Sequence, residues 1–457
     1  RWPVQLTAWA ALALVYHFAV WPPLIGLCWI VALFLTAAQP RVGLGLALLL
    51  LPFFYWHKAV ALVNRTITVP PAYVLLLCLM PALSLNLWQR LRQRTAHFYA
   101  LDWLAAAWLL ISLVAAANVW HWPGYGRGLV DLVLVPLLLY LATRTLLDQP
   151  CAWRSAVGGL AIGGVLVALL GLVSWLRGMG TAADSVLRLV GPHFSPNHTA
   201  LYLERTLFLL AGFAWASRGT WRWVGLTVWG CTLLALLLTA SRGAWLLGVP
   251  VGALCFALLV GRGSAENESA ASARPRMAWL GLATLALIVM IAIGVAGFGW
   301  ERLSNQATVL DRVAIWRSSA ALWRDFPLAG TGPGGFYWLY PAYLPPGSTM
   351  DPNLRHPHNL WLEFGSMWGV IGLGWIIVTL GVAWSSLRRL WRNWPTVSHE
   401  WIACQPIAAG LVAGLAAGVA HGQVDAFGAL ADLAAWNWAA FGLLSVLVIH
   451  VRGETNE

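Results

Sequence analysis

The chain has 457 residues, of which 60% are hydrophobic and only 10% are charged. A soluble protein of this composition would lack the polar surface that water requires, so the composition predicts a protein that crosses a membrane many times. The net charge is +11, but no separate basic and polar domain is present, and we therefore expect no nucleic-acid partner.

Apolar runs separated by proline, glycine or arginine predict about fourteen membrane spans, with about twelve as the alternative count, because each run is near the length that a helix needs to cross a bilayer. We therefore expect an all-α, polytopic transmembrane helical bundle, with one long extracytoplasmic loop that carries short helices. The third and sixth runs are short, so a re-entrant hairpin is an alternative there. The predicted spans are 4–20, 22–38, 42–56, 70–86, 99–118, 127–142, 155–176, 198–216, 222–240, 243–260, 277–298, 358–385, 402–420 and 433–450.

Arginines fall on alternate connections between these spans, and the positive-inside rule makes those connections and both termini cytoplasmic. The chain then divides into an N-terminal transmembrane bundle (1–298), an extracytoplasmic active-site loop (299–357) and C-terminal transmembrane helices (358–457). The connections that face outward on this scheme are 21–23, 57–69, 119–126, 177–197, 241–243, 299–357 and 421–432.

A group of arginines lies on the outward connections, against the charge bias that sets the topology. Each one alone is explained by snorkelling or by pairing with a nearby acid. Too few acids lie nearby to pair all of them, so for the group we favour an anionic ligand such as a lipid-linked pyrophosphate, which the planar guanidinium binds through two hydrogen bonds. These residues are Arg127, Arg177, Arg188, Arg242, Arg302, Arg312, Arg317, Arg324 and Arg355.

The segment 188–200 is a second concentration of polar groups. Ser195, Pro196 and Asn197 are typical of a helix start, where the side chain of Ser195 or Asn197 would cap free amides. The same helix start also attracts an anion, and the two roles are compatible. His193 and His198 are five residues apart, not the three or four that place two side chains on one helical face, so we expect no metal pair there.

Arg242 enters a tight corner, Ser241-Arg242-Gly243, directly after an apolar run. Because an arginine there is hard to explain as solubilising, the corner favours anion binding over a contact with lipid headgroups. The glycine-rich segment 330–335 lacks the end of a phosphate-binding P-loop, so it either turns the chain or lets the backbone approach a substrate. The aromatic residues at 336–343 favour an interfacial belt over a sugar-stacking wall.

His356-Pro357-His358-Asn359 opens the span that follows the long loop. A histidine near several arginines stays neutral and suits a general base near neutral pH. A structural capping role is the alternative. A metal site is disfavoured, because the two histidines are two residues apart around a proline with no obvious third ligand. The six cysteines lie in or beside apolar runs, which indicates neither a disulfide framework nor a structural metal.

Five motifs follow one another around the long outer loop. They are Arg188 with Pro196-Asn197, Ser241-Arg242-Gly243, Arg312 with Trp316, Gly330 to Gly335, and His356-Pro357-His358-Asn359 with Gly369 and Gly372. In this order they resemble the O-antigen ligase and O-antigen polymerase superfamily of bacterial envelope enzymes. The resemblance covers residues 185–375 by motif and the rest only by its multispan pattern.

The resemblance implies a metal-independent, inverting glycosyltransferase of the bacterial inner membrane, with its active site facing the periplasm and no cofactor. An undecaprenyl-diphosphate-linked glycan would be the donor, and lipid A-core or a second lipid-linked glycan the acceptor. His358 would be the catalytic base, and Arg188, Arg242 and Arg312 would hold the pyrophosphate. Supporting contacts to the substrates are expected from Arg317, Asp311, His356, Asn197 and Asn359.

Two readings within the family share this donor chemistry: an O-antigen ligase uses lipid A-core as acceptor, and a polymerase extends a lipid-linked chain. Transfer to a pilin-like protein is disfavoured, because no additional C-terminal span and domain is visible. A transporter of anions or lipid-linked glycans is the alternative from another class, with the arginines along a translocation path. The polar residues gather at one face and not at mid-span, which favours the enzyme.

Overall fold

The computed structural model describes residues 2–62, 65–93, 98–183, 186–263, 307–394 and 399–453. It confirms the expected all-α polytopic bundle, since the strands within these ranges form only two short antiparallel hairpins, β1–β2 and β3–β4. The elements of the first part are α1 (Trp2–Phe18), α2 (Pro22–Ala38), α3 (Pro40–Leu49), η1 (Leu51–Phe53), β1 (Lys58–Leu62), β2 (Arg65–Val69), α4 (Pro71–Arg92), α5 (Ala100–Val114), η2 (Ala115–Asn118), α6 (Trp122–Leu129), η3 (Val130–Leu134) and α7 (Val135–Leu146).

The second part of the chain contributes the helices that surround the polar loops. Its elements are α8 (Pro150–Leu176), β3 (Thr181–Ala183), β4 (Val186–Arg188), α9 (Pro196–Ala216), α10 (Thr220–Leu238), η4 (Ala244–Gly248), α11 (Val249–Gly263), α14 (Ala307–Asp325), α15 (Gly335–Leu339), η6 (Tyr340–Tyr343), α16 (Leu360–Arg392), α17 (His399–Ile402), α18 (Gln405–His421) and α19 (Ala431–Gly453).

Eight helices in the described part of the chain are long and apolar enough to cross a membrane. Each predicted span within that part overlaps a helix, and the span predicted over 277–298 lies outside it. Two lengths differ from expectation. The third helix ends at Leu49 and is followed by η1, so its ten residues cover about 15 Å, half of a bilayer. The sixth is longer than expected, because α6, η3 and α7 are continuous over 25 residues, Trp122–Leu146.

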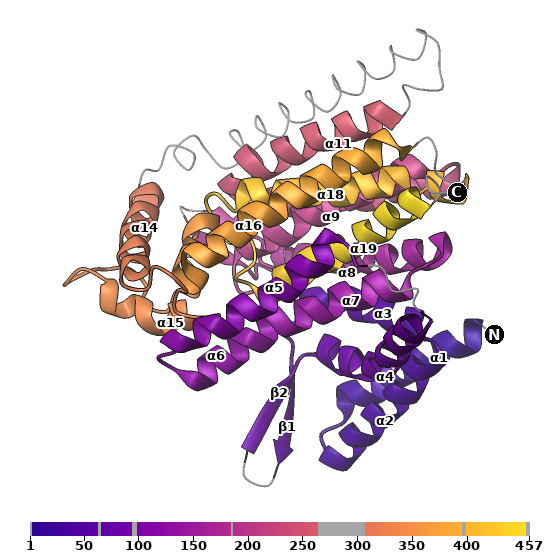
Figure 1. The fold of residues 1–457 in the computed structure, drawn as a ribbon, viewed down its shortest axis with the longest axis horizontal. Helices are drawn as coiled ribbons and strands as arrows, with labels where there is room; N and C mark the ends of the chain where they lie inside the picture. Colours follow the sequence, from indigo (N-terminus) through magenta and orange to yellow (C-terminus); the bar gives the residue numbers. More distant parts are fainter. Residues whose placement is uncertain are drawn as a thin grey trace.

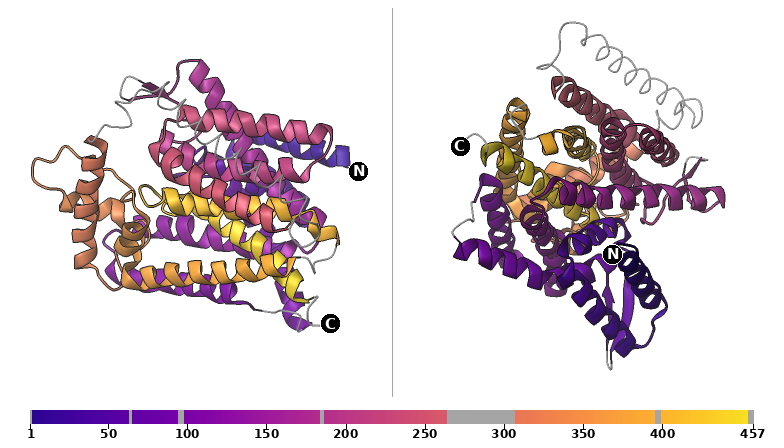
Figure 2. Two further views of the ribbon diagram at one scale, coloured as in Figure 1. Left: turned by 90° about the horizontal axis from the view of Figure 1, so that it is seen from above. Right: turned by 90° about the vertical axis from the view of Figure 1, so that its right-hand side faces the viewer.

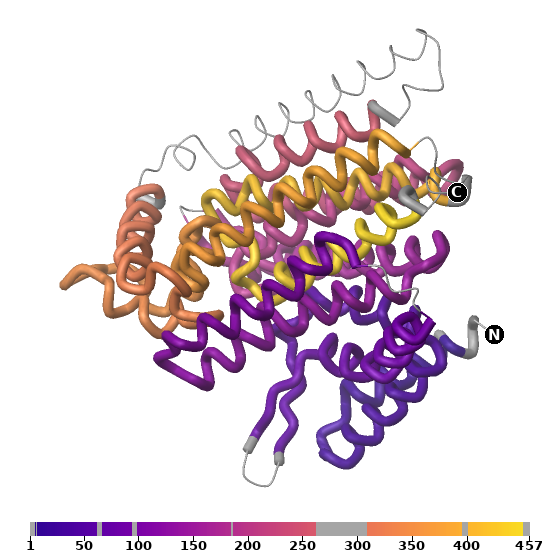
Figure 3. Tube along the Cα trace, in the orientation of Figure 1, coloured from indigo at the N-terminus to yellow at the C-terminus, as the bar shows by residue number. Residues whose placement is uncertain are grey.

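The connections that the sequence assigns to one side of the membrane gather at one end of the bundle. There the Asn118 amide donates to the carbonyl of Gly330, and the backbone N–H of Leu360 donates to that of Gly422. In Figures 1 and 2, α14 and α15 lie at this end, away from both termini. The tube in Figure 3 follows the chain back and forth between the two ends.

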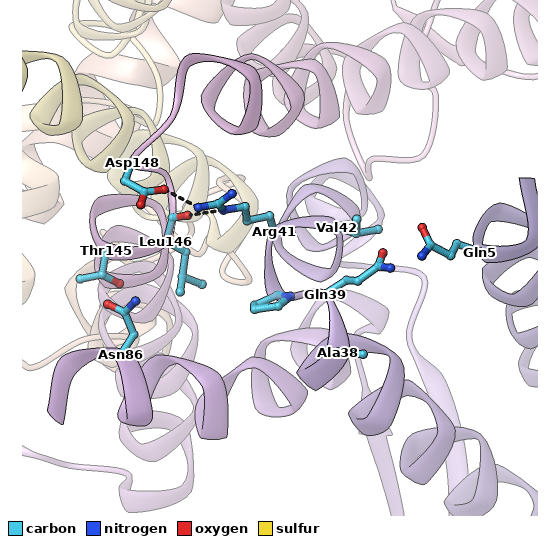
Figure 4. Close-up of a pocket in the computed structure, with 10 residues that line it drawn as sticks. Gln5, Ala38, Gln39, Arg41, Val42, Asn86, Thr145, Leu146 and Asp148 are labelled. Carbon is cyan, nitrogen blue, oxygen red and sulfur yellow. Dashed lines mark hydrogen bonds and ion pairs between the residues drawn. The ribbon is translucent and has the colours of Figure 1, made fainter. Parts of the chain in front are cut away.

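The opposite end of the bundle holds a cavity of about 620 Å³ between α2, α3, α4 and α7. Figure 4 shows Arg41 extending from α3 toward the end of α7, where its guanidinium donates to the carbonyl of Leu146 and pairs with Asp148. Arg41 is one of the arginines that set the predicted topology, and the carboxylate of Asp148 neutralises its charge. These contacts join α3 to the end of α7, so we assign the cavity a structural role.

Three glycines of α18, Gly410, Gly414 and Gly418, are four residues apart and therefore share one face of the helix. A Cβ added at Gly410 would lie 2.4 Å from the carbonyl oxygen of Phe208, and one at Gly418 would lie 2.4 Å from Nη2 of Arg205. Small residues at this spacing let two helix backbones approach closely in a membrane. They explain why α18 and α9 form the most extensive helix pair of the bundle.

Gly410→Ala is expected to lower the thermal unfolding temperature, because the new methyl group meets backbone of α9 and overpacking costs about 1–3 kcal/mol. Gly381→Ala on α16 is the matched control, since nothing lies within 4 Å of the added Cβ. Alanine there improves helix propensity, so stability should stay or rise. Thermal melts of both variants in the same detergent check this, and equal unfolding temperatures would contradict the close approach of α18 to α9.

Candidate active site

The carboxylate of Asp425 is the centre of the polar cluster at the end of the bundle. It lies in the turn between α18 and α19, and its side chain is only 2% exposed. Oδ1 accepts from Nδ1 of His358 at 2.9 Å and from the backbone N–H of Ala426 at 2.9 Å. Oδ2 accepts from Nη2 of Arg312 at 3.1 Å and from the side-chain amide of Asn197 at 3.1 Å. One buried carboxylate therefore holds side chains from three distant parts of the chain.

Arg188 extends this network from the β3–β4 hairpin. Its Nη2 donates to the side-chain oxygen of Asn197 at 2.7 Å, and its Nε donates to the carbonyl of Thr239 at 2.8 Å. Ser195, not Asn197, caps α9, since its hydroxyl accepts from the backbone N–H of His198 at 3.1 Å. The Asn197 side chain is thereby left to join Arg188 to Asp425. Two guanidinium groups thus reach the same carboxylate, one directly and one through an amide.

His358 is held by both its ring and its backbone. Its φ of +52° is in the left-handed region, which costs a non-glycine residue about 1–3 kcal/mol and points to a conformation imposed by its surroundings. Its carbonyl accepts from Nε1 of Trp316 at 3.2 Å. Because the carboxylate of Asp425 requires a hydrogen at Nδ1, the lone pair of the neutral ring is at Nε2. The side chain is about a fifth exposed, so this lone pair is positioned to accept a proton from a substrate.

His356 and Asn359 support this arrangement from either side. Burial, together with the nearby His358, lowers the pKa of His356 to about 3, and its Nδ1 accepts from the backbone N–H of His358 at 3.4 Å. The side-chain oxygen of Asn359 caps α16 by accepting from two backbone N–H groups, and its amide donates to the carbonyl of Gln423 at 2.8 Å. Both residues orient the chain at His358 and join it to the turn that carries Asp425.

The charge of the cluster is unbalanced toward the positive side. Burial acts to raise the pKa of Asp425, but the facing His358 and Arg312 bring it well below its usual range, so the group stays ionised. Nη1 of Arg312 is buried and has no hydrogen-bond partner among the described residues. An anion at this position would satisfy it.

Of the other predicted site residues, Arg242 lies beside this cluster, whereas Arg317 and Asp311 do not hydrogen-bond to its described residues. Arg242 is half-buried in the corner after α10, and the neighbouring Gly243 packs against His421 and Val424, just before Asp425. The corner is therefore beside the cluster. Arg317 and Asp311 are exposed on α14. Arg317 follows Arg312 by five residues, about 140° around the helix, so its side chain points elsewhere.

The segment 330–343 is buried on one side, and Trp338, Pro341 and Ala342 are exposed. Gly330, with φ of +67°, lies where a Cβ would be 2.3 Å from the backbone of Met367, so it lets the chain turn against α16. Phe336 and Tyr340 are fully buried and their rings stack at 4.9 Å. The expectation of an interfacial belt is therefore wrong for these two aromatics. The elements that carry them, α15 and η6, cover the end of the bundle, and both rings lie on the buried face.

A second cluster joins His193, His198 and Asp432, all of which are buried. Their ligand-type atoms lie within 4.8 Å of one another, as do those of His356, His358 and Asp425. From the sequence, a metal at His193 and His198 is disfavoured because of their spacing along a helix, but His193 lies before α9 and not on it. A metal at His356 and His358 is disfavoured because no third ligand is visible in the sequence, and Asp425 is a third group of the right kind.

Asp425 and Asp432 are the functional candidates that sequence reasoning missed. Both are visible as acids near span ends, but no local pattern links them to residues more than 200 positions earlier, such as Asn197 and His198. A third buried group lies deeper in the bundle, where Glu204 accepts from Nδ1 of His421 at 3.0 Å and Arg205 donates to the side chain of Asn437 at 3.3 Å. Glu204 is buried, and its partners are within the protein.

A search of curated proteins gave no match. Residues 226–377 match the family model described as O-Antigen ligase, a region that includes Arg242, Arg312, His356 and His358. The match spans four of the five motifs taken from the sequence, and the structure adds a helical bundle with many apolar helices. The chain is a multi-pass membrane protein, and about a third of its length is similar to the O-antigen ligase family.

Proposed function

We propose that the protein is a glycosyltransferase that moves a glycan from an undecaprenyl-diphosphate carrier to a sugar hydroxyl of lipid A-core. The observation that carries the proposal is the hydrogen-bonded chain from Arg188 through Asn197 and Asp425 to His358 and Arg312. It sets a neutral base beside two cationic groups at one end of a membrane bundle. We place the protein in the bacterial inner membrane because of its similarity to the O-antigen ligase family, with this end outside the cytoplasm, as the arginine distribution favours.

In the proposed reaction, Nε2 of His358 accepts the proton of the acceptor hydroxyl as its oxygen attacks the anomeric carbon. A new carbon–oxygen bond forms on the face opposite the leaving group, and the bond to the diphosphate breaks, which inverts the anomeric configuration. Arg312, Arg188 and Arg242 bind the diphosphate and stabilise the charge that develops on it. Asp425 holds the proton at Nδ1 of His358 and stabilises the imidazolium that forms.

This chemistry requires positioning more than activation. The diphosphate is already a good leaving group, so a base, cationic partners and alignment of two bound substrates are sufficient. No metal or cofactor enters a step of the proposed reaction. His356, Asn197 and Asn359 are proposed to support substrate binding indirectly, because they position the side chains that contact the substrate. Arg317, which points away from the cluster, is not assigned this role.

A transfer assay with purified protein and a labelled undecaprenyl-diphosphate glycan tests the proposal, with two acceptors in separate reactions. Label that moves to lipid A-core is the expected result. A ladder of longer lipid-linked chains would instead assign the polymerase reaction, which uses the same donor site. If neither product forms while the protein moves the labelled lipid between the leaflets of a vesicle, the enzyme proposal is wrong and the transporter reading replaces it.

A further inference from the structure

The buried cluster of His193, His198 and Asp432 is separate from the atoms of the proposed reaction. His193 lies in the segment between β4 and α9, His198 in the first turn of α9, and Asp432 in the first turn of α19. The side chains are 0%, 1% and 0% exposed, respectively. Burial of a carboxylate is costly unless it is paired or coordinates a cation.

The hydrogen bonds around Thr199 decide which nitrogen of His193 carries its proton. The hydroxyl of Thr199 uses its one hydrogen toward a backbone carbonyl, with Val190 and Ser195 both at 3.2 Å. With that hydrogen engaged, Nδ1 of His193, at 3.3 Å, is placed to donate to the Thr199 oxygen. We assign the proton of the neutral ring to Nδ1 on this ground, which leaves a lone pair on Nε2.

That lone pair faces a carboxylate oxygen. Nε2 of His193 is 3.4 Å from Oδ2 of Asp432 and makes no hydrogen bond to another side chain or backbone group in the part of the chain that the structure describes. Two acceptors that face each other in a dry site repel, and a positive species between them removes the repulsion. His198 directs its Nε2 to the same carboxylate, at 2.8 Å from Oδ1 and 2.9 Å from Oδ2, while its Nδ1 has no partner among the described residues.

We propose that His193, His198 and Asp432 bind a divalent transition-metal ion of the zinc class. Two imidazole nitrogens and a carboxylate oxygen are ligands that zinc prefers. Ligands of a tetrahedral ion at about 2.0–2.1 Å lie about 3.3 Å apart, close to the 3.4 Å between His193 and Asp432. For His198 to reach the same geometry, the distance between its Nε2 and the Asp432 oxygens must increase by several tenths of an ångström. Its single ring proton must then be on Nδ1, so that Nε2 can bind the ion.

The contact of His193 with Thr199 is the outer interaction that such a ligand needs, because a metal-bound histidine donates its other N–H to a fixed acceptor. The bound ion has a structural role, since it ties the segment after β4 to α9 and α19. His198 follows Asn197 directly, and Asp432 begins the helix after the turn that holds Asp425. The metal would thus fix the distance between these two parts of the active-site network, and the inference does not depend on the proposed function.

Metal analysis of the full chain tests the site, with purification through a tag that contains no histidine. We expect about one zinc per chain, and a metal-depleted sample should take up Co²⁺ and develop the visible absorption of a tetrahedral cobalt site. His193→Gln, His198→Gln and Asp432→Asn should each lose the metal at least about tenfold, since an imidazole or carboxylate ligand is removed. His17→Gln, at an exposed histidine of α1, should keep it.

Wild-type protein that contains no zinc and takes up neither Zn²⁺ nor Co²⁺ would overturn the proposal and leave a shared proton as the positive species. Unchanged metal content in all three ligand variants would overturn it as well. The cobalt spectrum of the wild type needs no variant, so a variant that fails to fold does not obscure the result. None of these readouts uses glycan transfer, so a failure here is distinct from a failure of the proposed activity.

Discussion

Asp425→Asn is expected to lower glycan transfer by about 10²-fold or more, because a general base contributes about 10²–10⁴ to the rate and needs its proton at the correct nitrogen. An asparagine keeps the size of Asp425 but can turn its amide toward His358 and Arg312, which reverses the hydrogen bond at Nδ1. Single-turnover transfer with saturating donor and acceptor measures the effect. Asp351→Asn, at an exposed acid of the long loop, is the control and should transfer at the wild-type rate.

A double variant separates this positioning role from a general loss of structure. If Asp425 acts through His358, then Asp425→Asn should cost little further activity in a chain that already carries His358→Ala. Additive losses would contradict that coupling. The pH of the assay does not interfere, because a depressed folded-state pKa keeps Asp425 ionised. The stability it contributes is present above the unfolded value of about 3.9 and is lost only as the pH falls through the still lower folded value.

Arg312→Ala is expected to reduce transfer by about 10²–10³-fold, the usual effect of removing a donor that stabilises developing charge. Arg312→Lys should recover only part of the loss, because an ammonium group keeps the charge but cannot hold Asp425 and a phosphate oxygen with one planar fork. Titration of the labelled donor against both variants measures its binding separately from the rate.

Arg324→Ala is the matched control for Arg312, since it removes an exposed arginine from the last turn of the same helix, α14. It should change neither donor binding nor transfer by more than about twofold, as expected for a solvated surface charge. Equal losses at the two positions would mean that the overall positive field of α14 attracts the donor, and the specific role of Arg312 would be wrong.

The sequence predicts the parts of this protein that depend on local patterns. Apolar length is enough to place the helices. The alternation of arginines predicts which connections share one side of the membrane. The start of α9 at Pro196 and the cap of α16 at Asn359 are also local, because each depends on a few adjacent side chains. The family match then supports the functional class that the ordered motifs suggest.

The sequence does not reveal the partners that hold the site together. Asp425 meets Arg312 and Asn197 only because α18 packs closely on α9 and brings its following turn to the hairpin and to α14. His193 and His198 join Asp432 because the segment before α9 folds back over its first turn, which helical spacing does not describe. The burial of Phe336 and Tyr340 likewise depends on how α15 covers the bundle. Each is a long-range consequence of packing.

The most direct test of the account compares His358→Ala with wild type in single-turnover transfer, alongside equilibrium binding of the labelled donor to both proteins. His358 is proposed to remove a proton and not to bind the diphosphate, so transfer should fall by about 10²–10⁴-fold while donor affinity stays the same. Transfer by His358→Ala within about tenfold of wild type would contradict the role of His358 as the base, since the lost contribution would be smaller than general-base catalysis provides.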